Sequence, residues 1–433
     1  PGGGAERLSA TWAQAPPAVH PASVGADPPM TIRLRLGPGA MLAVDSHPRR
    51  IEYPPDATIH FHRGTPMFAR LTRFAAAAVL GMAATIAHAE ERVVNVYNWS
   101  DYIAKDTLEK FTKETGIKVN YDTYGENEAL EAKLLAGKSG YDVVFPSASP
   151  FFAHQVKAGV YQKLDQAKIP NAKGLSKETM ASLAKVDPGN AFGVPYMIAA
   201  TGIGYNVDMV KKVMPDAPTG SWAMLFDPAV ASRLKSCGVS LLDTPTEAVP
   251  AMLAFQGRDP MEQTKESLDA VMGALAPLRG NYRFIHSEKY RDALASGDIC
   301  VAHGYVGDLV QVRERAAKAK KPQTIAIAIP KEGAIVNIDV MAIPADAPHA
   351  DEAHAFINFI LRPDIVAEIT NETGYANAVP AADTLVDEAL SKDPVIYPPQ
   401  EMQAKLYTAP PPAGLDFDRA RARAWSKFKA AKK

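Results

Sequence analysis

The 433-residue sequence predicts an α/β protein built on parallel, doubly wound sheets. The main observation is that short β-branched runs alternate with segments of helical periodicity from Val93 onward. The composition, with 47% hydrophobic and 22% charged residues, excludes a disordered chain, a collagen-like repeat and a multi-span membrane protein. The length allows two or three domains of about 150 residues each.

The first five elements follow the order β-α-β-α-β, which is typical of a parallel sheet. Gly116 marks the end of the first helix, and Asn127 is placed to cap the second. The expected elements are a strand over 93–97, a helix over 104–115, a strand over 117–121, a helix from Asn127 to about Gly137 with Leu130, Leu134 and Leu135 on one face, and a strand over 141–145.

The alternation continues to the end of the chain without an internal repeat. The later expected elements are strands over 202–205, 299–302, 324–329 and 338–343, and helices over 290–296, 309–320, 351–361 and 416–431. The last helix is basic and amphipathic, and we expect it to face solvent rather than nucleic acid or lipid. A formal net charge of −1 likewise gives no support for a nucleic-acid partner.

Residues 1–66 differ in composition from the rest. They hold 11 of the 35 prolines, and six Arg but no Lys. Such a segment cannot bury enough apolar surface to offset the entropy of ordering. We expect a non-native or disordered extension, with translation starting at Met67.

Residues 67–89 have the three parts of a secretory signal peptide. A basic start carries Arg70 and Arg73, an apolar run covers 75–87, and a small-x-small cleavage site ends at Ala89. The alternative is a membrane anchor, but this run reaches only about 20 Å as a helix, whereas a bilayer core needs roughly 30 Å. We therefore expect a cleaved signal, a periplasmic protein and no stable membrane insertion.

The chain has two cysteines, Cys237 and Cys300, both in the part expected to be exported. Export into an oxidising compartment favours a disulfide, and the alternative is two buried free thiols. No CxxC motif supports a redox or zinc site.

Signatures of catalysis are scarce in the sequence. It has no GxSxG, HExxH or P-loop motif and no GxGxxG after a strand, and none of its ten His has metal-ligand spacing. We expect neither an enzyme nor a metal or cofactor site.

Aromatic and polar side chains follow several of the expected strands. The segments are 98–102, 146–149, 243–247 and 303–308, and Asp339 lies inside a strand. Ligands of open α/β sheets bind outside the carboxyl ends of the strands, so these segments are candidates for a binding site. Each carboxylate could also be a helix cap or turn former, and each aromatic a core residue.

Eight ordered blocks of the chain closely resemble the bacterial periplasmic polyamine-binding proteins, particularly the putrescine-binding type. The resemblance spans 92–428 and does not cover 1–66. The blocks are VYNWSDYI (96–103), KETGIKV (113–119), VFPSAS (144–149), TGIGYN (201–206), KSCGVS (235–240), SGDICV (296–301), IPKEGA (329–334) and RARAW (421–425).

The resemblance implies a type II periplasmic binding protein fold, in which two doubly wound α/β lobes close on a ligand in the cleft between them. It implies an N-terminal lobe of 90–197 plus 338–384 and a C-terminal lobe of 198–333 plus 389–433. The chain would cross between the lobes near 195–200, 332–338 and 384–390. It also implies that Cys237 and Cys300 form a disulfide.

The resemblance also implies a binding site, a polyamine ligand and an inner-membrane ABC permease as partner of a monomeric receptor. Tyr305 stands where the family usually has Trp, and Asn337 stands where it usually has an aromatic residue. The implied ligand contacts are Trp99, Ser100, Asp101, Tyr102, Ser147, Glu247, Ser287, Tyr305, Asp308, Asn337, Asp339 and Tyr375.

These residue types suit a diamine, whose ammonium groups need acceptors and whose methylenes need flat apolar walls. Putrescine is the first expectation. Asn337 keeps open a ligand with a polar tail, such as agmatine or spermidine, and a different solute such as an amino acid, a sugar or ferric ion is a further alternative. A sensor without a transport role would have the same pocket.

Overall fold

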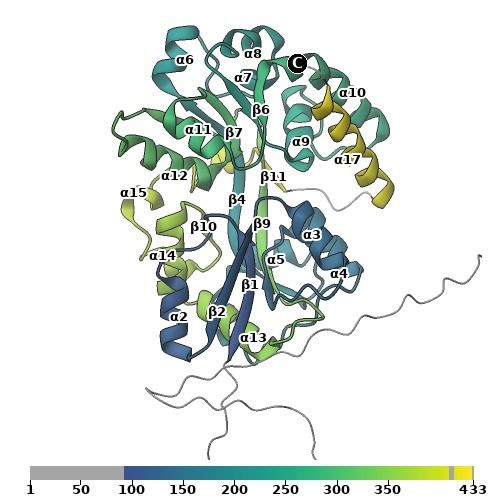
Figure 1. The fold of residues 1–433 in the computed structure, drawn as a ribbon, viewed down its shortest axis with the longest axis vertical. Helices are drawn as coiled ribbons and strands as arrows, with labels where there is room; N and C mark the ends of the chain where they lie inside the picture. Colours follow the sequence, from purple (N-terminus) through teal and green to yellow (C-terminus); the bar gives the residue numbers. More distant parts are fainter. Residues whose placement is uncertain (1–91, 409–413, 432–433) are drawn as a thin grey trace, which may run out of the picture. The chain divides into compact units, whose positions relative to one another are not determined.

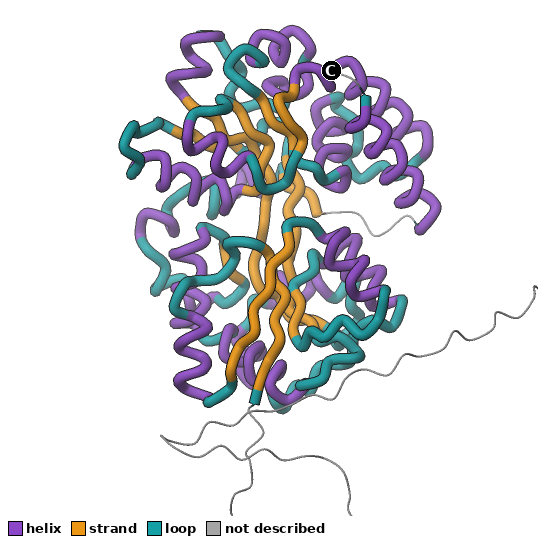
Figure 2. The backbone as a smooth tube through the Cα atoms, in the orientation of Figure 1, coloured by secondary structure: helices purple, strands orange, loops and turns teal. Residues whose placement is uncertain are grey.

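The structure, a computed structural model, describes residues 92–408 and 414–431. The expected extension 1–66 and signal segment 67–89 lie outside the described residues. Figure 1 shows the strands of the described chain with helices packed on both sides of them. In Figure 2 the strands, in orange, run through the middle of this chain between the purple helices.

The strands of the described residues form one continuous sheet. Their bounds are β1 Val93–Trp99, β2 Lys118–Tyr124, β3 Val143–Val144, β4 Gly193–Asn206, β5 Val239–Leu241, β6 Tyr282–Ile285, β7 Val301–Tyr305, β8 Ile325–Ala328, β9 Ala334–Ala342, β10 Ala376–Asn377 and β11 Leu406–Thr408. The hydrogen-bonded order is β2-β1-β3-β9-β4-β7-β5-β6, while β8 and β10 pair with β4, and β11 pairs with β9.

Two long strands, β4 and β9, join two regions of this sheet. The first sheet region contains β1, β2, β3, β10 and residues 193–200 of β4, and the second contains β5 to β8 and residues 201–206 of β4. β4 carries the chain from the first region into the second, and β9 carries it back, so the two strands are antiparallel. The predicted parallel pairing is confirmed for β1 with β2 and β3, and for β5 with β6 and β7. It is wrong for β4 and β9, because successive crossings run in opposite directions.

Helices pack beside both sheet regions (Figure 1). The α-helices are α2 Thr107–Thr115, α3 Asn127–Leu135, α4 Ala153–Lys157, α5 Lys177–Leu183, α6 Val207–Val213, α7 Ala223–Phe226, α8 Pro228–Leu234, α9 Pro245–Phe255, α10 Lys265–Leu275, α11 Tyr290–Ser296, α12 Val306–Ala317, α13 Ala350–Ile360, α14 Pro363–Thr373, α15 Glu388–Ser391, α16 Gln400–Gln403 and α17 Leu415–Ala430. Shorter turns of 3₁₀ or π type are η1 Ala148–Phe152, η2 Pro170–Gly174, η3 Ala276–Asn281 and η4 Pro380–Ala382.

The core beside β1 shows why these elements form. Val94 and Val96 alternate with half-exposed residues along β1 and are fully buried. Phe111 of α2 packs edge-on against Phe356 and Phe359 of α13, with ring centroids 5.2 and 5.3 Å apart. Burial of each such side chain contributes about 1.5–3 kcal/mol relative to exposure, which fixes these helices on the sheet.

Helix α3 differs from its prediction in two respects. Asn127 is the first residue of the helix rather than its cap, and its buried side chain bonds to Ser147 instead. Leu130 and Leu134 are buried as predicted, but Leu135 is 58% exposed. Adjacent helix positions lie about 100° apart, so Leu134 and Leu135 cannot share one face.

The strand expected over 299–302 also lies later, at β7 Val301–Tyr305. It includes His303, which is fully buried against Trp222, with ring centroids 5.1 Å apart. Burial lowers the pKa of His303 to about 3, so the imidazole is neutral and packs as an apolar core residue. The predicted strand ended too early, at residue 302, because His303 is a polar residue type.

The disulfide between Cys237 and Cys300 is confirmed, and the alternative of two free thiols is wrong. Cys237 follows α8, and Cys300 directly precedes β7, so the bond ties two neighbouring segments of the second sheet region. The two residues are 63 positions apart. Closing a loop of this length stabilises the fold by about 4 kcal/mol on a chain-entropy account.

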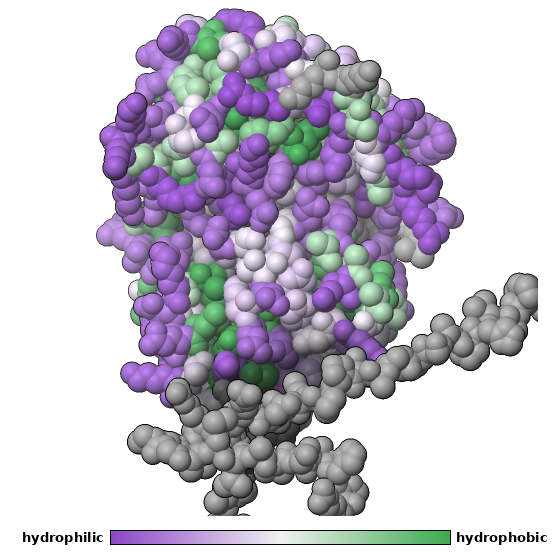
Figure 3. Space-filling model, in the orientation of Figure 1, coloured by the Kyte–Doolittle hydropathy of each residue, from purple (hydrophilic) through white to green (hydrophobic). Residues whose placement is uncertain are grey.

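The surface was viewed from one side for its polarity. The face drawn in Figure 3 is mostly hydrophilic, in purple, and its hydrophobic side chains, in green, gather in small separate groups. None of the helices in the described residues combines the length and the apolarity that a membrane crossing requires.

Candidate functional site

A pocket opens where the two sheet regions meet, and residues of both regions line it. Eleven of the twelve predicted contacts line it: Trp99, Ser100, Tyr102, Ser147, Glu247, Ser287, Tyr305, Asp308, Asn337, Asp339 and Tyr375. The fold thus gathers segments far apart in the chain around a single cavity, and their role in binding stays a prediction.

Asp339 lies in the middle of β9 and is almost fully buried. Its Oδ2 accepts a hydrogen bond from the hydroxyl of Tyr102 at 2.7 Å, and its Oδ1 accepts one from Ser147 Oγ at 2.6 Å. Asn127 in turn holds Ser147 through its amide. Burial raises the pKa of Asp339 to about 6, although both hydroxyl donors favour the charged form.

Glu247 lies in the first turn of α9, directly after β5, and is also buried. Its Oε1 accepts a hydrogen bond from Asn337 Nδ2 at 2.9 Å. Its Oε2 is buried and makes no hydrogen bond within the described part of the chain. Burial raises the pKa of Glu247 to about 8, and the nearby charge of Asp339 raises it further, while the Asn337 donor opposes the shift.

Asp308 lies in the first turn of α12, directly after β7. Its Oδ2 accepts a hydrogen bond from Tyr290 at 2.7 Å, and its Oδ1 accepts one from Tyr375 at 2.8 Å. Burial raises the pKa of Asp308, and the charge of Arg291 opposes that shift. Gly307 leaves room for this arrangement, because a Cβ there would lie 2.2 Å from the Tyr375 ring.

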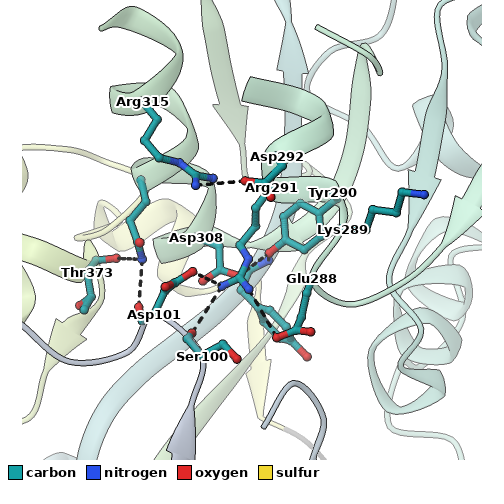
Figure 4. A network of polar contacts seen from close by, with 12 residues as sticks. Ser100, Asp101, Glu288, Lys289, Tyr290, Arg291, Asp292, Asp308, Arg315 and Thr373 are labelled. Carbon is teal, nitrogen blue, oxygen red and sulfur yellow. Dashed lines mark hydrogen bonds and ion pairs between the residues drawn. The ribbon is translucent and has the colours of Figure 1, made fainter. Parts of the chain in front are cut away.

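Arg291 of α11 is a cation in this largely acidic pocket, and Figure 4 shows its contacts. Its Nη1 lies 3.9 Å from Asp308 Oδ2 and 2.9 Å from Asp101 Oδ2. The same nitrogen donates to the carbonyl oxygen of Ser100 at 3.4 Å, and Nη2 lies 3.5 Å from Glu288 Oε1. Arg291 thus joins the loop after β1 to the second sheet region.

Asp101 is the one predicted contact outside the pocket lining. Its side chain is 60% exposed, and its backbone has a φ of 56°, which turns the loop after Ser100. Gln311 Nε2 donates to the Asp101 carbonyl oxygen at 3.4 Å. Asp101 therefore lies at the rim, where it pairs with Arg291.

Aromatic rings form the walls of the pocket. The ring centroids of Trp99 and Tyr124 are 4.7 Å apart, and those of Tyr102 and Tyr375 are 4.6 Å apart at 89°. Trp99 and Tyr124 both donate to the carbonyl oxygen of Phe145, at 2.7 and 2.6 Å. Their polar atoms are thereby satisfied by the protein, which leaves ring faces for an apolar chain or a cation.

Five lining residues were not predicted: Tyr124, Gly125, Ala199, Glu288 and Arg291. Tyr124 is the last residue of β2, and Gly125 follows it. Glu288 and Arg291 lie after β6. The strand-end rule that selected the other loops would have included these four. Ala199 lies inside β4 and carries no such signal.

The described residues contain no group of three or more His, Cys, Asp or Glu placed to hold a metal ion. The carboxylates of the pocket are instead surrounded by hydroxyl, amide and aromatic groups, which suits an organic cation better than a hard metal ion.

Comparison with known proteins gives the family. The bacterial extracellular solute-binding protein family matches residues 106–398. The chain belongs to this family. Its members are binding proteins rather than enzymes, and the predicted non-enzymatic role and type II fold are confirmed.

Relatives and solved structures agree with this assignment. The chain is 52% identical over 359 residues to the putrescine-binding periplasmic protein SpuD of Pseudomonas aeruginosa, covering 82% of this chain and 96% of that protein. It is 46% identical over 364 residues to the putrescine-binding periplasmic protein PotF of Escherichia coli, covering 84% and 98%. The crystal structure of the spermidine/putrescine ABC transporter substrate-binding protein PotD of Streptococcus pneumoniae superposes with a TM-score of 0.63 and 26% identity, covering 78% and 98%.

Proposed function

We propose that this chain is a periplasmic receptor that binds a polyamine, putrescine first, in the pocket between its lobes and delivers it to an ABC importer. The observation that carries the proposal is the set of three buried carboxylates, Glu247, Asp308 and Asp339, around one aromatic-walled pocket. Two relatives named as putrescine-binding periplasmic proteins share about half of their residues with the chain.

The pocket chemistry matches a diamine group by group. Each ammonium donates hydrogen bonds and accepts none, and each bond to a carboxylate contributes about 1.5–3 kcal/mol. Rings such as Trp99 and Tyr102 offer faces to the methylene chain, and a cation over a ring gains roughly 0.5–2 kcal/mol. After the costs of desolvation and lost freedom, the balance is about −8 kcal/mol, a micromolar ligand.

The proposal includes the lobe division and the export route. The lobes are 90–197 plus 338–384 and 198–333 plus 389–433, and closure would bend the crossings near 195–200, 332–338 and 384–390. The signal segment 67–89 would be removed on export, to give a monomer in the periplasm. Amino-terminal sequencing of the exported protein should begin at or near Glu90, and a mature chain that keeps 1–66 would contradict this route.

Titration calorimetry of the exported protein tests the ligand. The panel is putrescine, agmatine, spermidine, a linear monoamine, an amino acid and a neutral sugar. We expect micromolar binding of a diamine and no heat from the monoamine, amino acid or sugar, because these cannot neutralise several buried carboxylates. Binding of the amino acid or sugar with no polyamine heat would overturn the proposal.

A further inference from the structure

Arg291 raises a question about the charge of the ligand. The proposed ligand is a cation, yet the pocket contains a guanidinium whose side chain is only 13% exposed. It is the only cation among the lining residues, all of which belong to the described chain. A buried cation in a cation-binding site opposes the ligand unless it serves the site in another way.

The buried charges of the pocket can be counted. Glu247, Asp308 and Asp339 are almost fully buried, so their charges are poorly screened by water. With all three ionised, and with Arg291 protonated, the buried groups have a net charge of −2. Glu288 and Asp101 are 40% and 60% exposed, so water weakens the effect of these two rim carboxylates on the pocket interior.

Arg291 also lies at one end of the pocket. It is 3.9 Å from Asp308 and bonds to the rim at Ser100, whereas Glu247 and Asp339 have no cation within bonding distance in the described residues. A ligand ammonium held by Glu247 and Asp339 would therefore leave the rest of the ligand to extend toward Arg291. A further positive charge there would meet like charge.

We propose that Arg291 is a specificity-determining residue that limits the pocket to ligands with two positive charges and rejects triamines. This inference rests on the proposed polyamine function. Arg291 neutralises part of the charge of Asp308. The two charges of a dication therefore match the buried net charge of −2, and the third charge of a trication exceeds it. A diamine or a guanidino-amine meets this condition, and spermidine does not.

The first test needs only the natural sequence. Titration calorimetry should give an affinity for putrescine at least about tenfold higher than for spermidine, since one unscreened like-charge contact costs at least this much. Equal or tighter binding of spermidine would overturn the inference while the polyamine function stands. Absence of binding to every amine would overturn the proposed function itself.

The second test compares variants at matched positions. Arg291→Gln should reduce the putrescine-to-spermidine affinity ratio at least about tenfold, mainly through tighter spermidine binding, and Arg291→Lys should keep the ratio. Arg315→Gln is the matched control, because Arg315 pairs with the exposed Asp292, at 3.2 Å, and is not among the residues that line the pocket. Figure 4 shows both arginines.

A purely positioning role gives a different result. If Arg291 only fastens the rim loop, Arg291→Gln should weaken both ligands by the same factor, and Asp101→Asn, which removes that ion pair and keeps the guanidinium, should do the same. Arg291→Gln losing both ligands in parallel, with the ratio unchanged, would overturn the charge-limiting role. If Arg291→Gln does not fold, an altered ratio in Asp101→Asn would contradict it equally, because the buried charge is unchanged in that variant.

Discussion

The two ends of the pocket satisfy their carboxylates in different ways. At one end Asp308 accepts bonds from Tyr290 and Tyr375 and lies beside the protein's own cation, Arg291. At the other end Asp339 accepts bonds from two neutral hydroxyls, and Glu247 accepts one bond from an amide. The first end is partly neutralised by a cation of the protein, whereas the carboxylates of the second end are neutralised by bound protons or by a ligand.

This difference indicates where in the pocket a ligand ammonium gains the most binding free energy. The charge of Asp339 raises the pKa of Glu247, after the larger effect of burial, which shows that the two carboxylates oppose each other's ionisation. Burial also raises the pKa of Asp308, but there the charge of Arg291 and the hydroxyls of Tyr290 and Tyr375 oppose the shift. An ammonium placed between Glu247 and Asp339 relieves the burial cost of two charges at once.

Removing one carboxylate charge at each end compares the two ends directly. We expect the largest loss of affinity from one of these two substitutions. Asp339→Asn should weaken putrescine binding by about a hundredfold or more, because a buried charge pair loses one partner. Asp308→Asn should cost only about tenfold, because Arg291 offsets part of the Asp308 charge and keeps its nearer partner, Asp101 at 2.9 Å, in this variant. Titration calorimetry at pH 8 gives, for each variant, the ratio of its putrescine affinity to that of the natural chain.

The two substitutions are isosteric, so each serves as the control for the other. Both proteins should keep the circular dichroism spectrum of the natural chain. Equal losses at the two positions would show that Arg291 does not offset Asp308, and a larger loss at Asp308 would reverse the comparison between the ends.

Most of the end formed by Glu247 and Asp339 could be predicted from the sequence. Asp339, Glu247 and Ser147 were found by their place after or within strands and by the resemblance of short blocks, and the fold brings all three to one pocket. The bond between Asn337 and Glu247 was not predictable, because it joins positions 90 residues apart through the crossing strand β9. Sequence spacing gives no information on such a contact.

Less of the other end, around Asp308, could be predicted. Asp308 was predicted, but Arg291 was missed, because the strand that precedes it, β6, was not among the predicted strands. Its role depends on the packing of α11 against α12 and on the loop that carries Asp101, neither of which a local pattern encodes. The antiparallel central strands were missed for a similar reason, since the direction of a strand follows from the course of the whole chain.

The pH dependence of ligand affinity also distinguishes the two ends. The pKa of Glu247 is raised to about 8 and that of Asp339 to about 6, both chiefly by burial, so protons occupy this end of the free protein near neutral pH. A ligand ammonium stays protonated below about pH 10 and needs the ionised carboxylates. Affinity should therefore rise from pH 6 to pH 8, by up to about tenfold per pH unit where one proton is released.

Calorimetry in buffers of different ionisation enthalpy measures the released protons directly. At pH 7 the natural chain should release a proton on binding, and Glu247→Gln should release much less. Asp308→Asn should leave the release nearly unchanged, because Asp308 lies at the other end. Affinity that falls as pH rises, or release that persists in Glu247→Gln, would contradict the assignment of these protons to Glu247.

The smallest expected effect concerns Asn337, which donates to Glu247 Oε1 at 2.9 Å. Asn337→Ala removes this donor, which should weaken putrescine binding by roughly 1 kcal/mol, about fivefold, and shift the rise in affinity to higher pH, because the donor favours the charged carboxylate. Asn120→Ala is the matched control, since Asn120 is exposed and its side chain donates to Asn95 at 2.8 Å, outside the pocket lining. An unchanged pH profile in Asn337→Ala would mean that the amide does not tune Glu247, and the high pKa of Glu247 would then follow from burial and from the charge of Asp339.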